Sequence, residues 1–274
     1  MKAVAICHMR ILARLIAFAS AVAGTFGFPP AVPDTAARFP VLVELFTSEG
    51  CSSCPPIDAL VQRIDASQPL PNVQLIVLSE HVDYWDHDGW KDPYSSSSFT
   101  ERQEQYVRAL KLDEPYTPQI IINGNEVVRS YSSPKITEAF QSAGTTPTIP
   151  VRIGSLRIEN SNQPLVRARI EVDGGSAPRN ADVYLAIALD HAESQVSAGE
   201  NNGKRLAHVA VVEYLKKVGK LDAGKPFAQD CQARLKKTVS GTDLRIVAFV
   251  QEPGPGKVLG TALRKLSPDG STTP

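Results

Sequence analysis

The chain has 274 residues, 42% of them hydrophobic and 21% charged, which is the balance of a folded globular protein rather than a disordered or fibrous one. Its 29 basic and 29 acidic residues cancel, so we expect no nucleic-acid partner, because electrostatic binding to nucleic acid usually needs a basic surplus. The length allows one large domain or two ordinary ones.

The N-terminus has the pattern of an export signal. Three basic residues precede a short apolar run over residues 15–23, which ends on Ala21-Val22-Ala23. A membrane span needs about 20 apolar residues, so the pattern predicts a signal peptide over residues 1–23, with an uncleaved anchor as the alternative. Its removal leaves 26 basic and 29 acidic residues, a net charge of −3. We expect a secreted or periplasmic protein with no membrane span after cleavage.

Residues 24–37 are rich in proline and indicate a linker. Beyond them, the short apolar runs Val41–Phe46 and Val73–Ser79 predict buried strands. Between these runs, Ile57–Ile64 places its apolar side chains on one helical face. Strand, helix and strand at this spacing predict a parallel, right-handed βαβ unit.

Three further elements complete the first half. Ser98-Phe99-Thr100-Glu101 has the form of a capping box and predicts a helix that runs to about Leu112. Asn123-Gly124, between short apolar runs, has the signature of a tight hairpin. Ser133-Pro134 then predicts a last helix. The expected order over residues 38–146 is β-α-β-α-β-β-α.

The second half has a different pattern. After a Thr- and Pro-rich linker, short strand-like runs alternate with turn residues; they are Val151–Ile158, Leu165–Val172, Val183–Leu189 and Leu244–Val250. These runs predict an antiparallel β-sandwich over residues 150–268. The segment Val209–Val218 fits a helix and a strand equally well.

Cys51-Ser52-Ser53-Cys54 is the most informative motif of the sequence. It follows a predicted strand and opens a predicted helix. The first turn of a helix has unpaired N–H groups and partial positive charge, which stabilise a thiolate. We therefore expect thiol–disulfide exchange in which Cys51 attacks and Cys54 resolves the mixed disulfide.

Two other uses of the cysteine pair stay open. A tetrahedral zinc site would need two more ligands at matching spacing, and the sequence has no second CxxC and no HxxxH. A structural disulfide suits an exported protein, although closing so small a loop removes little entropy from the unfolded chain. If Cys51 pairs with Cys54, Cys231 has no evident partner; we expect a buried thiol there, with an intermolecular link as the alternative.

Val41–Phe46, the CxxC motif and Tyr116-Thr117-Pro118-Gln119 together resemble the thioredoxin-like fold. The resemblance implies a cis bond between Thr117 and Pro118 that lies against the disulfide and exposes the preceding backbone to a substrate peptide. It also implies a buried acid on the strand before the cysteines, which assists proton transfer at the resolving thiol. Glu44 is the candidate, and a partly exposed strand glutamate is the alternative interpretation.

More closely, the chain resembles the DUF1223 family of bacterial secreted thioredoxin-like proteins, whose function is unknown. The motifs that carry this resemblance are Glu44–Pro56, His81–Asp86, Gly89–Pro93, Tyr116–Gln119 and Gly199–Gly203. They extend over most of the mature chain. The resemblance implies a fold and a redox site, and no particular substrate.

Residues 81–93 follow the second predicted strand, at the end of the sheet where α/β folds place their ligands. They contain both tryptophans of the chain, Trp85 and Trp90. With His81, these side chains would form a wall beside the disulfide that selects the substrate; a loop anchored by buried Trp rings is the alternative. His81 would stabilise a Cys51 thiolate, bind a metal or simply be hydrogen-bonded.

The sequence therefore predicts an exported thiol–disulfide oxidoreductase with a thioredoxin-like domain and a β-sandwich. Thr117-Pro118 would hold a protein or small-molecule thiol or disulfide substrate, and we expect no resident cofactor or metal. A copper-binding protein that uses the cysteine pair and His81 is the first alternative. A non-catalytic binding module with a structural disulfide is the second.

Overall fold

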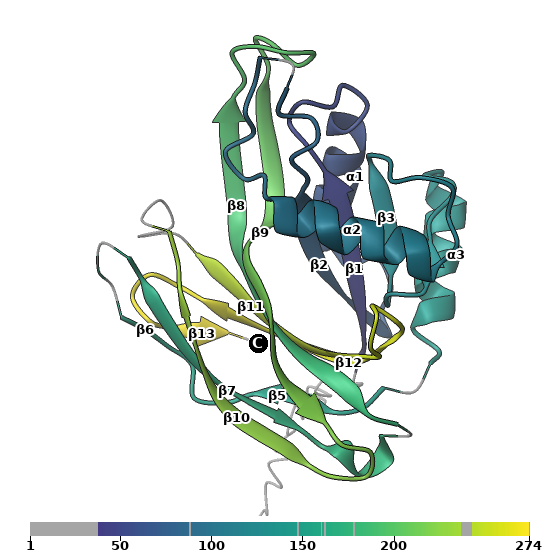
Figure 1. The fold of residues 1–274 in the computed structure, drawn as a ribbon, viewed down its shortest axis with the longest axis vertical. Helices are drawn as coiled ribbons and strands as arrows, with labels where there is room; N and C mark the ends of the chain where they lie inside the picture. Colours follow the sequence, from purple (N-terminus) through teal and green to yellow (C-terminus); the bar gives the residue numbers. More distant parts are fainter. Residues whose placement is uncertain are drawn as a thin grey trace, which may run out of the picture. The chain divides into compact units, whose positions relative to one another are not determined.

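The structure is a computed structural model that describes residues 38–87, 89–146, 148–159, 161, 163–177, 179–236 and 243–273. The predicted signal peptide and the predicted linker over 24–37 lie outside the described residues. In the described part of the chain, a large mixed sheet, three α-helices and a small antiparallel sheet make up the fold (Figure 1).

The order of elements predicted for residues 38–146 is confirmed. In chain order these elements are β1 (Phe39–Thr47), α1 (Pro55–Ser67), β2 (Val73–His81), α2 (Ser97–Ala109), β3 (Gln119–Ile122), β4 (Glu126–Val127) and α3 (Ser133–Ala143). The elements that follow are β5 (Val151–Ile153), β6 (Arg157–Glu159), β7 (Leu165–Val172), the 3-10 turn η1 (Gly174–Ser176), β8 (Ala181–Gln195), β9 (Arg205–Leu221), β10 (Phe227–Arg234), β11 (Leu244–Gln251), β12 (Val258–Leu266) and β13 (Thr272–Thr273).

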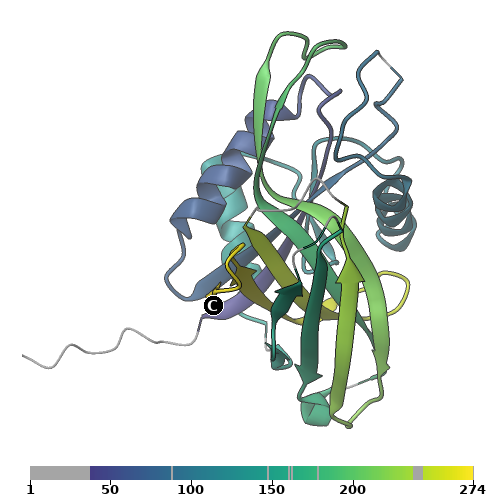
Figure 2. The ribbon, with the colours of Figure 1, turned by 90° about the vertical axis from the view of Figure 1, so that its left-hand side faces the viewer.

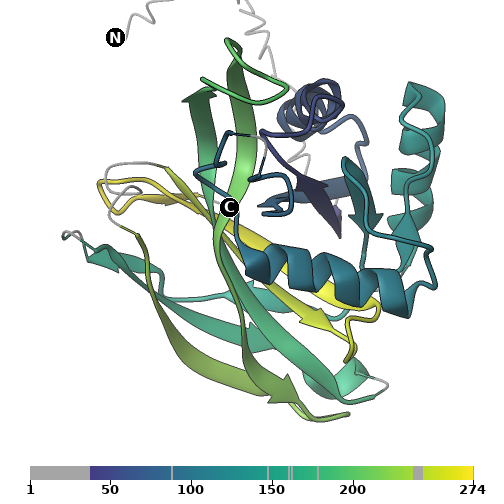
Figure 3. The same ribbon diagram turned by 45° about the horizontal axis from the view of Figure 1, so that its top comes forward.

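Strand β1 organises the first half. It pairs in parallel with β2 along its whole length and antiparallel with β3, so the predicted parallel βαβ unit is confirmed. Because side chains alternate along a strand, β1 presents Val43 and Leu45 to one face and Leu42 and Phe46 to the other. Helices α1 and α3 cover the first face, and α2 covers the second (Figures 1 and 3).

Local sequence signals predicted one hairpin turn and the approximate ends of α2. Asn123 and Gly124 both adopt left-handed φ values, 45° and 70°, as the Asn-Gly hairpin signature requires. The capping box was placed two residues too late, because Ser96 is the N-cap of α2 and accepts a hydrogen bond from the Ser98 N–H. Helix α2 also ends at Ala109, before the expected Leu112.

The second half extends the sheet of the first half. The order of the large sheet is β13-β12-β11-β8-β9-β2-β1-β3-β4, and the two halves join where Ser79 of β2 pairs with Val211 of β9. The segment Val209–Val218, which fitted a helix or a strand, is part of the long strand β9. The sheet runs across the predicted domain boundary near residues 146–150, and that boundary stays a prediction.

The small sheet forms a second layer. It has the order β10-β7-β5, with β6 paired to β7, and one apolar cluster lies between it and strands β8, β11 and β12 (Figure 2). The run Val151–Ile158, predicted as one strand, is divided into β5 and β6 around Gly154. Strands β10 and β12 carry no clear alternation in the sequence and were not predicted.

A buried ion cluster fixes α2 to the large sheet. The Arg102 guanidinium of α2 lies 2.6 Å from a Glu44 carboxylate oxygen of β1 and 3.7 Å from Glu80 of β2. The Tyr106 hydroxyl donates to the second Glu44 oxygen over 2.5 Å. Burial, together with the neighbouring Glu44 charge, raises the pKa of Glu80 well above its ordinary value, and Arg102 offsets only part of this. Arg102 is therefore the cation that two buried glutamates share.

We predict that Arg102→Ala lowers the free energy of unfolding by about 3–5 kcal/mol, because it leaves Glu44 buried without its cation. Urea unfolding followed by circular dichroism measures this change. The matched control is Arg108→Ala on the same helix, whose pair with Glu104 is 66% and 48% exposed; we expect a change below about 1 kcal/mol. Equal effects of the two substitutions would contradict the assignment.

Candidate functional site

Cys51 and Cys54 form a disulfide between the end of β1 and the start of α1. Their Cα atoms lie 5.5 Å apart, and Cys54 is the N-cap of α1, with two prolines in the first turn as predicted. The Cys54 N–H donates to the Cys51 carbonyl over 3.2 Å. Both cysteines are 0% exposed, so the bridge is closed to solvent in this state. The Ser53 hydroxyl lies 3.3 Å from the Cys51 sulfur.

The segment before β3 lies beside the disulfide loop. The Thr117–Pro118 peptide bond is cis, as the thioredoxin-like resemblance implied. The Thr117 carbonyl lies 3.5 Å from the Ser53 hydroxyl, and the Thr117 hydroxyl accepts a hydrogen bond from Trp85 over 2.8 Å. The structure thus brings together Thr117, Pro118 and Trp85, three of the residues that the sequence placed at the substrate.

Residues of the 81–93 segment hold the disulfide loop from one side. Trp85 packs so closely on Gly50 that a Cβ atom there would lie 2.9 Å from the Trp85 Cβ, which explains the glycine. The Trp90 ring N–H donates to the Glu49 carboxylate over 2.9 Å. Asp92 accepts from the Glu49 N–H over 2.9 Å. Both tryptophans therefore contact the loop that carries the cysteines, which fits a substrate wall and an anchored loop equally.

Glu44 does not lie at the disulfide. Its side chain points to the α2 face of β1, where it binds Arg102 and Tyr106, because alternate residues of a strand face opposite sides. Thr47, three residues later, points to the α1 face instead and donates to Asp58 over 2.8 Å. The role expected for Glu44 at the resolving thiol therefore has no geometric support.

Asp58 is the buried acid on the disulfide side, and sequence reasoning missed it. It lies one helical turn after Cys54, so the two side chains share a face of α1. Burial raises the pKa of Asp58 above its ordinary value, and the charges of His208 and His81 and the Thr47 hydrogen bond offset part of this. The spacing of four residues between Cys54 and Asp58 could have indicated that the two side chains share a face of α1. The prediction for α1 considered only its apolar side chains.

Two buried histidines belong to the same cluster. His81 binds Asp92 through Nδ1 at 2.7 Å, and His208 of β9 binds Glu49 through Nε2 at 3.2 Å. The two rings meet edge to face with centroids 4.7 Å apart. Burial alone would lower the pKa of His81, but the carboxylates of Asp92, Asp58 and Glu49 outweigh burial and raise it. His208 had no sequence signal, because its partners lie about 150 residues away.

The cluster gives no ligand set for the copper alternative. Among the described residues, no group of three His, Cys, Asp or Glu side chains is arranged to hold a metal ion. His81 uses one ring nitrogen for Asp92, and its other, Nε2, has no hydrogen-bond partner in the part of the chain that the structure describes. The described residues also include no helix that is long and apolar enough to cross a membrane.

The tip of the β8–β9 hairpin reaches the disulfide loop from the other side. The Ser52 N–H donates to the Glu200 carboxylate over 2.9 Å. The Asn201 amide donates to the carbonyls of Glu49 and Cys51 over 2.8 and 3.0 Å. The Gly199–Gly203 motif of the sequence thus meets the CxxC motif, although about 150 residues separate them.

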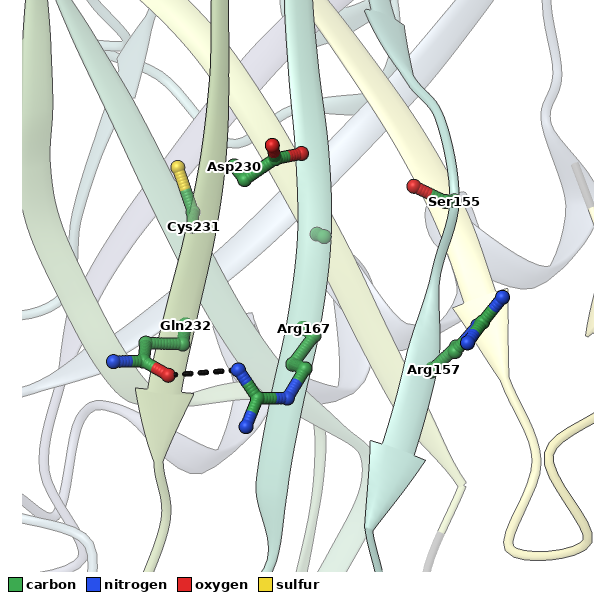
Figure 4. A pocket seen from close by; sticks show the side chains of 7 residues that line it. Ser155, Arg157, Arg167, Asp230, Cys231 and Gln232 are labelled. Carbon is green, nitrogen blue, oxygen red and sulfur yellow. Dashed lines mark hydrogen bonds between the residues drawn. The ribbon is translucent and has the colours of Figure 1, made fainter.

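Cys231 is a free, buried thiol on β10, in the apolar layer between the two sheets. Burial raises the pKa of this thiol, which keeps it protonated. It borders a cavity of about 400 Å³ beside the Arg167–Gln232 hydrogen bond (Figure 4). Its surroundings match the buried thiol that we expected and give it no part in the disulfide site.

Comparisons with known proteins give a family and a fold. The model of a family described as "Protein of unknown function (DUF1223)" matches residues 42–251. The crystal structure of protein AGR_C_4864 from Agrobacterium tumefaciens is similar, with a TM-score of 0.59 and 28% identity over 81% of this chain and 92% of that one. HBP35 of Porphyromonas gingivalis shares the fold, with a TM-score of 0.62 and 15% identity over 85% of this chain and 76% of that one. No curated protein matches.

We predict that Asp58→Asn raises the urea midpoint of unfolding at pH 7. The folded state resists ionisation of Asp58, whereas the unfolded chain ionises it freely, so the wild-type carboxyl costs stability as pH rises through its raised pKa. The difference should shrink as the pH falls to about 4, where the unfolded chain is also protonated. Asp113→Asn, at an exposed carboxyl, is the control. A difference that is the same at both pH values would contradict the prediction.

Proposed function

The chain belongs to the DUF1223 family, and we propose that it is an exported thiol–disulfide oxidoreductase that works through Cys51 and Cys54. The observation that carries the proposal is the place of the pair. The cysteines bridge the end of β1 and the N-terminus of α1, and the cis peptide bond of Pro118 lies beside them. This placement would stabilise a thiolate at the first cysteine and leave the second to resolve it.

We further propose a finer description of the fold. Elements β1 to α3 have the order and the pairing of a thioredoxin-like domain, with the cis proline before β3. The strands from β5 to β12 form the two layers of a β-sandwich, which shares its larger sheet with that domain. The shared sheet carries the β8–β9 tip to the cysteines.

The proposed reaction exchanges two electrons between the protein and a substrate disulfide. The Cys51 thiolate attacks one substrate sulfur, forms a mixed disulfide and expels the other substrate sulfur as a thiolate. Cys54 then attacks the Cys51 sulfur, which re-forms the internal bridge and releases the second substrate thiol. The protein dithiol is oxidised and the substrate disulfide is reduced. The reverse sequence oxidises a substrate dithiol.

Two side chains support these steps. The Ser53 hydroxyl, 3.3 Å from the Cys51 sulfur, would donate a hydrogen bond to the Cys51 thiolate. Asp58 would take the role that we expected for Glu44. It lies one helical turn from Cys54, and burial raises its pKa, so its carboxyl would hold a proton more readily and exchange it with the Cys54 thiol.

The substrate we propose is a protein or small molecule that carries a thiol or a disulfide. The Thr117 carbonyl accepts from Ser53, which lies between the cysteines, and Trp85 and Trp90 contact the loop that leads to Cys51; these groups would hold such a substrate. The export signal over residues 1–23 supports a secreted or periplasmic location, where a disulfide can persist.

One observation favours a second function. Both cysteines are 0% exposed, as expected of a structural bridge that ties the β1–α1 loop of a non-catalytic binding module. Such a bridge would resist reduction, whereas a catalytic one must open and close at each turnover. The experiments below separate these two functions.

We predict that Cys51→Ala removes all exchange between a peptide disulfide and glutathione, because the attacking sulfur is lost. When no other thiol is present, Cys54→Ser should keep the attack but accumulate mixed disulfides with the peptide, since the resolving thiol is lost. Mass spectrometry of acid-quenched samples measures both outcomes.

The matched control is Cys231→Ser, which removes the other thiol of the described residues, in the apolar layer between the two sheets, and should keep wild-type exchange. Full activity in Cys51→Ala would overturn the mechanism. So would a Cys54→Ser variant that forms no mixed disulfide with the peptide when glutathione is left out.

A further inference from the structure

Three segments contact the disulfide loop, and they are attached differently. Trp85 and Thr117 are hydrogen-bonded to each other, and both lie in segments that continue directly from strands of the sheet. The third segment is the tip of the β8–β9 hairpin, residues 196–204 (Figures 1 and 3). It meets the loop through the side chains of Glu200 and Asn201.

The tip is a preformed unit at the end of a two-stranded ribbon. The β8–β9 ladder ends at Gln195↔Arg205, whereas β9 pairs with β2, its neighbour on the other side, at Val211. Backbone bonds between Val196 and residues 203–204 close the tip on itself. A two-stranded ribbon is only marginally stable alone, so docking on the loop fixes the position of the tip.

Among the described residues, two side chains make the hydrogen bonds between the tip and the disulfide loop. Asn201 is fully buried and donates its amide to two carbonyls on either side of Gly50. Glu200 is exposed and accepts from the Ser52 N–H. A hydrogen bond adds little net stability, so thermal motion or a bound partner can break these bonds.

The Glu200 carboxylate also affects the chemistry of Cys51. It occupies the Ser52 N–H, which lies between the two cysteines and next to Cys51, whose thiolate would need positive polarity. The negative charge of the Glu200 carboxylate opposes formation of a negative charge on the Cys51 sulfur. Withdrawal of the tip would therefore expose the sulfur and release an N–H group for the thiolate at the same time.

We propose that residues 196–204 are a gate over the Cys51–Cys54 disulfide, held shut by Asn201 and Glu200, and that exchange takes place only when it opens. This inference rests on the proposed function, because a gate matters only if the disulfide exchanges with a substrate. It adds that the second half of the chain controls access to the cysteines of the first half. It also reconciles a catalytic disulfide with its full burial.

The test measures access with a small phosphine, tris(2-carboxyethyl)phosphine, on the oxidised full-length protein. The phosphine attacks one sulfur and donates two electrons, the S–S bond breaks, and water supplies the oxygen of the phosphine oxide and the protons of the two thiols. Alkylation after a rapid acid quench, read by mass, counts the thiols released with time.

We expect Asn201→Ala to raise the reduction rate about tenfold, because it removes two bonds that hold the gate shut. Glu200→Ala should raise the rate severalfold, and its exposed site keeps the test valid if the Asn201 variant does not fold. Asn202→Ala is the matched control, since this exposed neighbour makes no side-chain bond to the disulfide loop among the described contacts. Its rate should stay within about twofold of wild type.

Wild-type rates in both Asn201→Ala and Glu200→Ala would overturn the gate, as would an equal acceleration in Asn202→Ala. These outcomes are independent of the proposed function. If exchange persists in Cys51→Ala, the proposed function fails while the phosphine rates stand. If exchange needs Cys51 but the rates of phosphine reduction are unchanged in the Asn201 and Glu200 variants, the gate proposal fails and the proposed function stands.

Discussion

The buried backbone of residues 49–51 is the constraint on which the site depends. This loop carries the first cysteine away from β1, and its polar groups lie where water cannot reach them, so each needs a partner within the protein. Asp92 binds the N–H of Glu49, and Asn201 binds two of the carbonyls. When the tip is docked, two segments, one from each half of the chain, supply these partners together. The second half is therefore part of the site.

Burial of charge has different consequences on the two faces of β1. On the α2 face, Glu44 is neutralised by Arg102, and the cluster fixes a helix. On the α1 face, Asp58 has no arginine or lysine partner among the described residues; it accepts from Thr47 and lies 3.8 Å from a ring nitrogen of His208. Arg102 thus compensates the charge of Glu44, whereas burial raises the pKa of Asp58. The alternation of side chains along one strand decides which carboxyl belongs to the cysteines.

Local patterns predicted the elements that local forces determine. The βαβ unit, the Asn123-Gly124 hairpin and the CxxC pair follow from short stretches of sequence, and the cis bond before β3 came from the resemblance. The junction of the two halves depends on one residue pair, Ser79↔Val211, and no periodicity reveals it. His208 and Asn201 reach the site over about 150 residues, beyond any pattern that one sequence offers. Glu44 was misplaced because the prediction considered only its distance in sequence from Cys51. It did not consider that alternate side chains of a strand point to opposite faces of the sheet.

A redox titration of the Cys51–Cys54 couple in glutathione buffers tests the central claim most directly. Thiols are counted by alkylation and mass after equilibration, so a slow gate does not affect the result. We predict a reversible two-electron transition, near about −120 to −180 mV for an oxidant or isomerase, or near about −270 mV for a reductant. A couple below about −300 mV, which glutathione does not reduce, would contradict the account and identify a structural bridge.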